Sequence, residues 1–166
     1  VPIVEPEVLM NGSHDIKRCF DVTSKTQAIL FEALDKLDVN FSGIILKPNM
    51  VTPGFDCKNK SNVEEIAELT VKCLGANVPK EVPGIAFLSG GQSDESASNN
   101  LSYINKINHN PWKVTFSYGR ALQLEAMKKW KGDNKNNKEA QKIIIKRSYL
   151  NSLAASGKYN LKMEND

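Results

Sequence analysis

The sequence is poor in the residues that build disulfide frameworks and histidine metal sites. Its three cysteines, Cys19, Cys57 and Cys73, are scattered through 166 residues without a Cys-x-x-Cys spacing, and their odd number argues against a disulfide framework. The two histidines, His14 and His109, lie far apart in the sequence, so a histidine-built metal site is not expected. These absences indicate a reduced, cytoplasmic protein without a metal.

The sequence also lacks a large excess of charge and any long apolar run. A net charge of +3, with no basic run interleaved with aromatic residues, does not predict a nucleic-acid partner. No apolar run approaches the length of a membrane span and no signal peptide opens the chain, so no membrane partner is expected. The chain begins without methionine, on Val1, and we interpret it as cut from within a longer protein. Its 40% hydrophobic and 25% charged residues are typical of a globular protein with a sizeable core.

Short apolar segments alternate with longer helical patterns along the chain. The apolar segments cover residues 3–4, 44–46, 85–88 and 114–116. The first three are spaced by about 40 residues, the size of one strand–helix unit with its return loop. Four such units predict an α/β fold with parallel strands and right-handed crossovers, either an open doubly wound sheet or part of a (β/α)8 barrel.

The helical patterns carry start and stop signals. Ser61-Asn62-Val63-Glu64 has the form of a capping box, and Gly75 is expected to end the helix that follows it. A long closing helix is expected over residues 135–159, and the tail 160–166, which has no periodicity, is expected to fray. The first helix is expected to bury an apolar face made of Ile16, Cys19, Phe20, Leu30, Ala33, Leu34 and Leu37.

A lysine stands at the end of the second apolar segment. Ile44-Ile45-Leu46 predicts a strand buried on both faces, and Pro48 ends it because proline cannot donate to a ladder. Lys47 therefore lies at the carboxyl end of a buried strand, where α/β folds place their chemistry. Apolar surroundings would favour the neutral, nucleophilic form of its amine. The alternative is a lysine that extends from the strand end into water.

Glycine-containing turns follow the third and fourth apolar segments. In Ser89-Gly90-Gly91, backbone N–H groups can converge on an anion at a helix N-terminus, although a tight turn that binds nothing would use the same residues. Ser117-Tyr118-Gly119-Arg120 leads into the next helix, where an arginine is unfavourable for the helix dipole unless an anion binds there. A solvated surface arginine is the alternative. Because barrels often build phosphate sites after strands seven and eight, these loops favour the barrel and predict that the four strands are its fifth to eighth.

Four motifs together resemble class I fructose-bisphosphate aldolase, in the C-terminal half of that enzyme. They follow the family's order and spacing over essentially the whole chain: Val1-Pro2-Ile3-Val4-Glu5-Pro6-Glu7, Leu46-Lys47-Pro48-Asn49-Met50-Val51, Phe87-Leu88-Ser89-Gly90-Gly91-Gln92 and Ser117-Tyr118-Gly119-Arg120-Ala121-Leu122. The resemblance implies that residues 1–166 form the C-terminal half of a single (β/α)8 barrel domain. It further implies a cytoplasmic, glycolytic lyase, a homotetramer in this family, that reversibly cleaves fructose 1,6-bisphosphate into dihydroxyacetone phosphate and glyceraldehyde 3-phosphate.

The same resemblance implies roles for individual residues. Lys47 would form a Schiff base with the substrate, Glu5 would transfer protons, and Glu7 would act as a partner of the reacting groups rather than as a proton carrier. The residues that would hold a substrate phosphate are Ser89, Gly90, Gly91, Ser117, Gly119 and Arg120. No metal or other cofactor would be needed, because the iminium itself withdraws electrons from the bond that breaks.

The family places further site residues in the N-terminal half of the barrel, which is therefore an expected partner of this chain, beside the sugar-phosphate substrate. Three hypotheses follow: one half of a glycolytic lyase, a non-catalytic fragment or binding form that is inactive without the N-terminal half, and another Schiff-base barrel enzyme of the transaldolase type. Arg120 argues against the third, because it could bind a second phosphate group, which a monophosphate substrate does not have.

Four strands cannot close an eight-stranded barrel. The inward-facing side chains, Val4, Ile45 and Phe87 or their strand neighbours, are therefore expected to lack the packing partners that the other four strands would supply.

Overall fold

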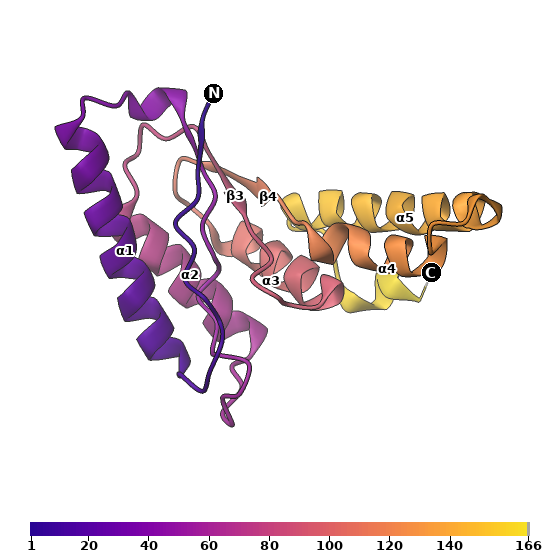
Figure 1. The fold of residues 1–166 in the computed structure, drawn as a ribbon. Helices are drawn as coiled ribbons and strands as arrows, with labels where there is room; N and C mark the ends of the chain where they lie inside the picture. The colour runs from indigo at the N-terminus through magenta and orange to yellow at the C-terminus, as the bar shows by residue number, and fades with distance from the viewer. Residues whose placement is uncertain (166) are drawn as a thin grey trace.

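Strands alternate with helices along the chain in the computed structural model, which describes residues 1–165 (Figure 1). The strands are β1 (Ile3–Val4), β2 (Ile45–Leu46), β3 (Gly84–Phe87) and β4 (Lys113–Phe116). The helices are α1 (Ile16–Lys36), α2 (Val63–Asn77), α3 (Asp94–Ile107), α4 (Arg120–Trp130) and α5 (Asn137–Ala155), with short 3-10 helices η1 (Phe41–Gly43), η2 (Asn134–Asn136) and η3 (Leu161–Glu164). Within residues 1–165, no helix is both long enough and apolar enough to cross a membrane.

The strands form one parallel sheet in chain order, β1-β2-β3-β4, which confirms the predicted succession of parallel strands. The register aligns one row of side chains that belongs to the main hydrophobic core, Val4, Leu46, Ile85 and Val114. Since side chains alternate between the two faces of a sheet, the preceding row lies on the other face and consists of Ile3, Ile45, Gly84 and Lys113. Its edge residues, Ile3 and Lys113, are exposed.

The face turned away from the helices carries Ile45 and, as the alternative in the prediction allowed, the strand neighbours Ile3 and Ala86 in place of Val4 and Phe87. Phe87 is fully buried in the core that contains apolar residues of α2 and α3, and Val4 packs against the same core. Ile45 pairs with Gly84, and Phe87 lies three residues beyond Gly84 on the same strand, so Ile45 and Phe87 must point to opposite faces.

The helices pack beside one another in the order of the chain. α1 contacts α2, α2 contacts α3, and α3 contacts both α4 and α5. In Figure 1, α4 and α5 form a hairpin that extends away from the sheet, at the end opposite to α1. This succession is the one that repeated right-handed crossovers produce when the helices share one face of a parallel sheet.

The N-terminus of α2 is capped one residue later than the sequence predicts. Asn62, not Ser61, is the N-cap, and its side chain accepts a hydrogen bond from the Glu65 N–H at 2.8 Å. The predicted stop at Gly75 is also wrong, because α2 continues to Asn77 and is closed by the Val78 N–H, which donates to the Leu74 carbonyl at 2.9 Å.

Replacing Asn62 with alanine is expected to lower the free energy of unfolding of the complete protein by about 1 kcal/mol, because a helix N–H loses its acceptor. Ser61→Ala is the matched control and is expected to have a much smaller effect. Denaturant titrations of the two variants measure the difference, and equal losses would mean that the cap does not lie at Asn62.

The closing region departs from the sequence prediction in two ways. Residues 135–159 do not form one helix, because α5 begins only at Asn137, after η2. The tail does not fray within the described residues, because η3 forms over residues 161–164 and the Glu164 carboxylate lies 2.7 Å from the Arg147 guanidinium. A local pattern could not reveal this ion pair, since its two residues are distant in sequence. Asp166, which also belongs to the predicted tail, lies outside the described residues.

Candidate functional site

Lys47 and Glu5 meet at the carboxyl ends of two neighbouring strands. Val4 pairs with Leu46 in the β1–β2 ladder, so the next residues of both strands, Glu5 and Lys47, come side by side. The Lys47 Nζ lies 2.9 Å from the Glu5 Oε1, with 22% of the lysine side chain and 44% of the glutamate side chain exposed. At this distance a proton can pass directly between an amine and a carboxylate.

The backbone around this pair is held by Asn49, a residue that the sequence alone does not single out as functional. Its side-chain Oδ1 accepts from the Val8 N–H at 3.1 Å, and its Nδ2 donates to Thr23 Oγ1 of α1 at 3.1 Å. Asn49 is 2% exposed. It therefore ties the segment after β1 to the segment after β2 and to α1. The only sequence signal was a polar residue within an otherwise apolar run after Pro48.

Glu7 is not part of the Lys47–Glu5 contact. It lies in the extended segment between β1 and α1 and is exposed. Within residues 1–165 it makes no ion pair. The predicted role of Glu7 as a partner of the reacting groups therefore stays a prediction.

The loop after β3 has the backbone conformation that its glycines permit. Gly90 and Gly91 have φ angles of 56° and 76°, in the left-handed region. A Cβ atom on Gly91 would lie 2.5 Å from the Phe55 ring, so a side chain at this left-handed position would be strained and would have to displace that ring. Ser89 is buried, and its carbonyl accepts from the Gln92 N–H at 3.0 Å, which closes the turn before α3.

The loop after β4 lies beside the loop after β3. The Ser117 N–H donates to the Phe87 carbonyl at 2.8 Å, which continues the ladder beyond the last residue of β4. Gly119 is the N-cap of α4 and supplies no side chain to accept from the helix N–H groups. Arg120 is the first residue of α4 and is exposed, and no carboxylate within residues 1–165 pairs with it. An uncapped helix start with an unpaired arginine is suited to bind an anion.

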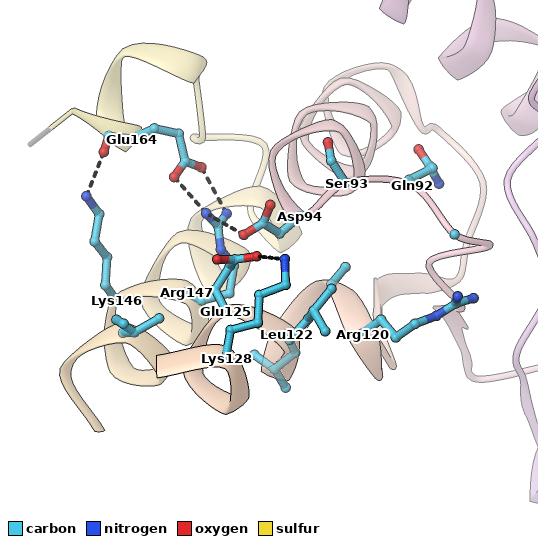
Figure 2. Close-up of a pocket in the computed structure, with 14 residues that line it drawn as sticks. Gln92, Ser93, Asp94, Arg120, Leu122, Glu125, Lys128, Lys146, Arg147 and Glu164 are labelled. Atoms are coloured by element: carbon cyan, nitrogen blue, oxygen red, sulfur yellow. Dashed lines mark hydrogen bonds and ion pairs between the residues drawn. The ribbon is translucent and has the colours of Figure 1, made fainter. Parts of the chain in front are cut away.

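The two loops share the wall of one cavity. It has a volume of about 650 Å³ and is lined by Gly91 and Gln92 from the first loop and by Arg120 and Ala121 from the second (Figure 2). Lys47 and Glu5 do not line it. The Leu88 N–H donates to the Pro48 carbonyl at 3.0 Å, so the strand end that carries Lys47 is nevertheless next to the one that carries Ser89.

Other candidate groups are few in the described part of the chain. Burial raises the pKa of the Cys19 and Cys73 thiols, which disfavours the reactive thiolate. Among residues 1–165, no group of three or more histidine, cysteine, aspartate or glutamate side chains is arranged to hold a metal ion.

Comparison with known proteins gives a consistent result over the whole chain. The family model described as "Glycolytic: Fructose-bisphosphate aldolase class-I" matches residues 1–166. Fructose-bisphosphate aldolase C of Rattus norvegicus is 53% identical over 160 residues, which are 96% of this chain and 44% of that protein. Fructose-bisphosphate aldolase A of Salmo salar is also 53% identical, with the same coverage.

A solved structure shows the same similarity in three dimensions. The fructose-bisphosphate aldolase of Plasmodium falciparum, in a complex with TRAP and a small-molecule inhibitor, matches with a TM-score of 0.94 and 47% sequence identity. The match covers 96% of this chain and 46% of that chain. The chain thus spans a little under half the length of the relatives it matches, and its four parallel strands are part of a (β/α)8 barrel, as the sequence predicts.

Proposed function

The chain belongs to the class I fructose-bisphosphate aldolase family, and from this premise we propose that it supplies the Schiff-base half of an aldolase barrel. The reaction would be the reversible cleavage of fructose 1,6-bisphosphate into dihydroxyacetone phosphate and glyceraldehyde 3-phosphate. One observation carries the proposal: the Lys47 amine and the Glu5 carboxylate lie 2.9 Å apart at the carboxyl ends of adjacent parallel strands.

The chemistry would begin at Lys47. Lys47 would first pass a proton to Glu5 across their 2.9 Å contact. Its neutral amine would then attack the C2 ketone of the substrate, and Glu5 would donate the proton with which the carbinolamine oxygen leaves as water. The resulting iminium withdraws electrons from the C3–C4 bond. Removal of the C4 hydroxyl proton, for which Glu5 is now the base, breaks this bond and releases glyceraldehyde 3-phosphate. The enamine that remains is protonated at C3, and hydrolysis of the imine then frees dihydroxyacetone phosphate and Lys47.

The loops after β3 and β4 would hold a substrate phosphate. Backbone N–H groups of the loop that contains Ser89, Gly90 and Gly91 would donate to it, together with the N-terminus of α4 at Gly119. Arg120 would add a charged fork of donors. Ser117, at the end of the β4 ladder, would complete this set. The support for this role is the left-handed glycine backbone and the unpaired arginine on one cavity wall.

The partners of the chain are proposals of the same kind. The matched relatives are more than twice as long as this chain, so we propose that the N-terminal half of a barrel completes the site. Assembly as a homotetramer and a place in cytoplasmic glycolysis follow from the family resemblance.

The direct test is an aldolase assay of the complete barrel in the presence of EDTA. Cleavage of fructose 1,6-bisphosphate that is insensitive to EDTA is expected, because the iminium replaces a metal as the electron sink. A complete barrel that binds the bisphosphate without cleaving it would favour the alternative, a non-catalytic binding form.

Replacing Arg120 with alanine is expected to weaken binding of the bisphosphate by about 1.5–3 kcal/mol, the usual range for a hydrogen bond to a charged group. The loss should be much smaller for an unphosphorylated analogue, and titration calorimetry with both ligands measures the difference. Lys128→Ala is the matched control, because Lys128 lines the same cavity but pairs with Glu125 in an exposed ion pair. Equal losses for both ligands would mean that Arg120 has a structural role only.

A further inference from the structure

A buried arginine joins three parts of the chain beside the glycine loop. Arg147 of α5 binds the Glu164 carboxylate of η3 through two hydrogen bonds, from Nη1 to Oε1 at 2.9 Å and from Nη2 to Oε2 at 2.7 Å. Its Nη2 also lies 3.3 Å from Oδ2 of Asp94, the first residue of α3. Its Nη1 donates to the Ser98 Oγ, one turn further along α3, at 3.3 Å. Figure 2 shows both carboxylates converging on this guanidinium.

This cluster differs in burial from the other ion pairs of the same helix. The Arg147 and Glu164 side chains are only 11% and 13% exposed, whereas those of Lys142 and Glu139, also on α5, are 74% and 54% exposed. The Tyr159 hydroxyl donates to Glu164 Oε1 at 2.5 Å. Burial alone would raise the pKa of Glu164, but the hydrogen bonds from Arg147 and Tyr159 outweigh it and hold the pKa below its ordinary value. A shielded, bidentate pair holds its geometry, while an exposed pair contributes little.

The α3 end of the cluster adjoins the loop proposed to bind phosphate. Asp94 opens α3 and Ser93 caps it, three and two residues after Gly91. The loop is anchored by Gln92, whose side chain donates to the Ser89 carbonyl at 3.0 Å and accepts from Asn100 of α3 at 2.7 Å, so its position is tied to that of α3. The cavity lined by Gly91 and Arg120 is also lined by Arg147 and Glu164.

We infer that Arg147, held by Glu164, is a positioning residue for phosphate binding. It fixes the first turn of α3 through Asp94 and Ser98, and so keeps Gly90 and Gly91 where they receive a phosphate group. The identity of that phosphate as part of a sugar bisphosphate rests on the proposed function. Arg147 does not bind the phosphate itself, because two carboxylates already occupy its guanidinium. The closing segment η3 thereby contributes to ligand affinity through Glu164.

The test compares Arg147→Met with wild type in the complete barrel, using inorganic phosphate as a calorimetric probe and fructose 1,6-bisphosphate as substrate. We expect the Kd for phosphate and the KM for the bisphosphate both to rise about tenfold. The kcat should change less than about twofold, because the lost binding energy stabilises the bound substrate and the transition state equally. Backbone hydrogen exchange of residues 89–95 should become faster than in wild type. Added phosphate should slow this exchange less than it does in wild type. Arg147→Lys, which keeps the charge but cannot form the bidentate pair with Glu164, should restore only part of the affinity.

Two controls separate positioning from general destabilisation. Lys142→Met removes an exposed cation from the same helix and should leave the phosphate Kd unchanged. Unphosphorylated fructose should show the same KM in wild type and Arg147→Met. Equal increases in KM for fructose and for the bisphosphate would overturn the inference, as would an unchanged phosphate Kd.

Two further outcomes are decisive. If Arg147→Met fails to fold, Asp94→Asn is used as the test variant instead. It should raise the phosphate Kd about threefold, because it weakens only the contact between Arg147 and the start of α3. An unchanged Kd in that variant overturns the inference. If the wild-type barrel does not cleave the bisphosphate, the proposed function fails, and the phosphate Kd and the exchange rates still decide the role of Arg147.

Discussion

Replacing Lys47 with arginine in the complete barrel is expected to reduce turnover of fructose 1,6-bisphosphate on the order of 10⁴-fold or more, the scale of loss when a covalent nucleophile is removed. An arginine stays protonated in proteins and has no free amine with which to form an imine. The arginine keeps a positive charge beside Glu5 and can replace the lysine in the 2.9 Å ion pair. The ends of β1 and β2 should therefore keep their positions. A coupled assay of glyceraldehyde 3-phosphate release measures the loss.

The matched control is Lys142→Arg, which replaces an exposed lysine of α5 that pairs with Glu139. It should retain turnover within about twofold, because surface substitutions of like charge cost little. Calorimetry should find bisphosphate binding by Lys47→Arg within about threefold of wild type, since the phosphate contacts remain. A Lys47→Arg variant that keeps a tenth of the wild-type turnover would exclude Lys47 as the nucleophile.

The chain alone, without the rest of the barrel, is expected to show no turnover and to associate. β1 and β4 are the edge strands of a parallel sheet and present unpaired N–H and C=O groups. Ile3, at one edge, is 59% exposed and lies on the face of the sheet that is turned away from the main hydrophobic core. Apolar surface of this kind, at an open edge, favours association over a soluble monomer.

Light scattering after size-exclusion chromatography measures the association, and the coupled assay measures turnover before and after the N-terminal half is added. We expect oligomers or aggregates that become active only with that half. The control is the complete barrel at the same concentration. A monomer that unfolds cooperatively and cleaves the bisphosphate without help would contradict the half-barrel account.

The sheet and the lysine–glutamate pair were predictable because both depend on short-range rules. Apolar segments separated by one helix unit predict parallel strands in chain order, and a residue that directly follows a strand must lie beside its counterpart on the next strand. Lys47 and Glu5 could therefore be expected to meet. Gly91 could be expected to adopt a left-handed conformation, because a strand turns into a helix there within a few residues.

What the sequence could not predict depends on partners that are distant along the chain. α1 buries Thr23 and Gln27 instead of the expected Ala33 and Leu37. Both buried polar side chains have distant partners: Thr23 accepts a hydrogen bond from Asn49, and Gln27 accepts one from the Cys73 thiol of α2. The order of the tail depends on the ion pair between Glu164 and Arg147, and no local periodicity predicts that contact. The cap of α2 was misplaced because Ser61 and Asn62 are both good N-cap residues, and only the backbone geometry selects between them.

Covalent trapping tests the central claim most directly. The complete barrel is incubated with dihydroxyacetone phosphate, reduced with sodium borohydride, digested and mapped by mass spectrometry. We expect the mass of the reduced triose phosphate to be added to the peptide that contains Lys47, and Lys47→Arg to take up no label. A label on a different lysine, or turnover that EDTA abolishes with no label on any peptide, would contradict it.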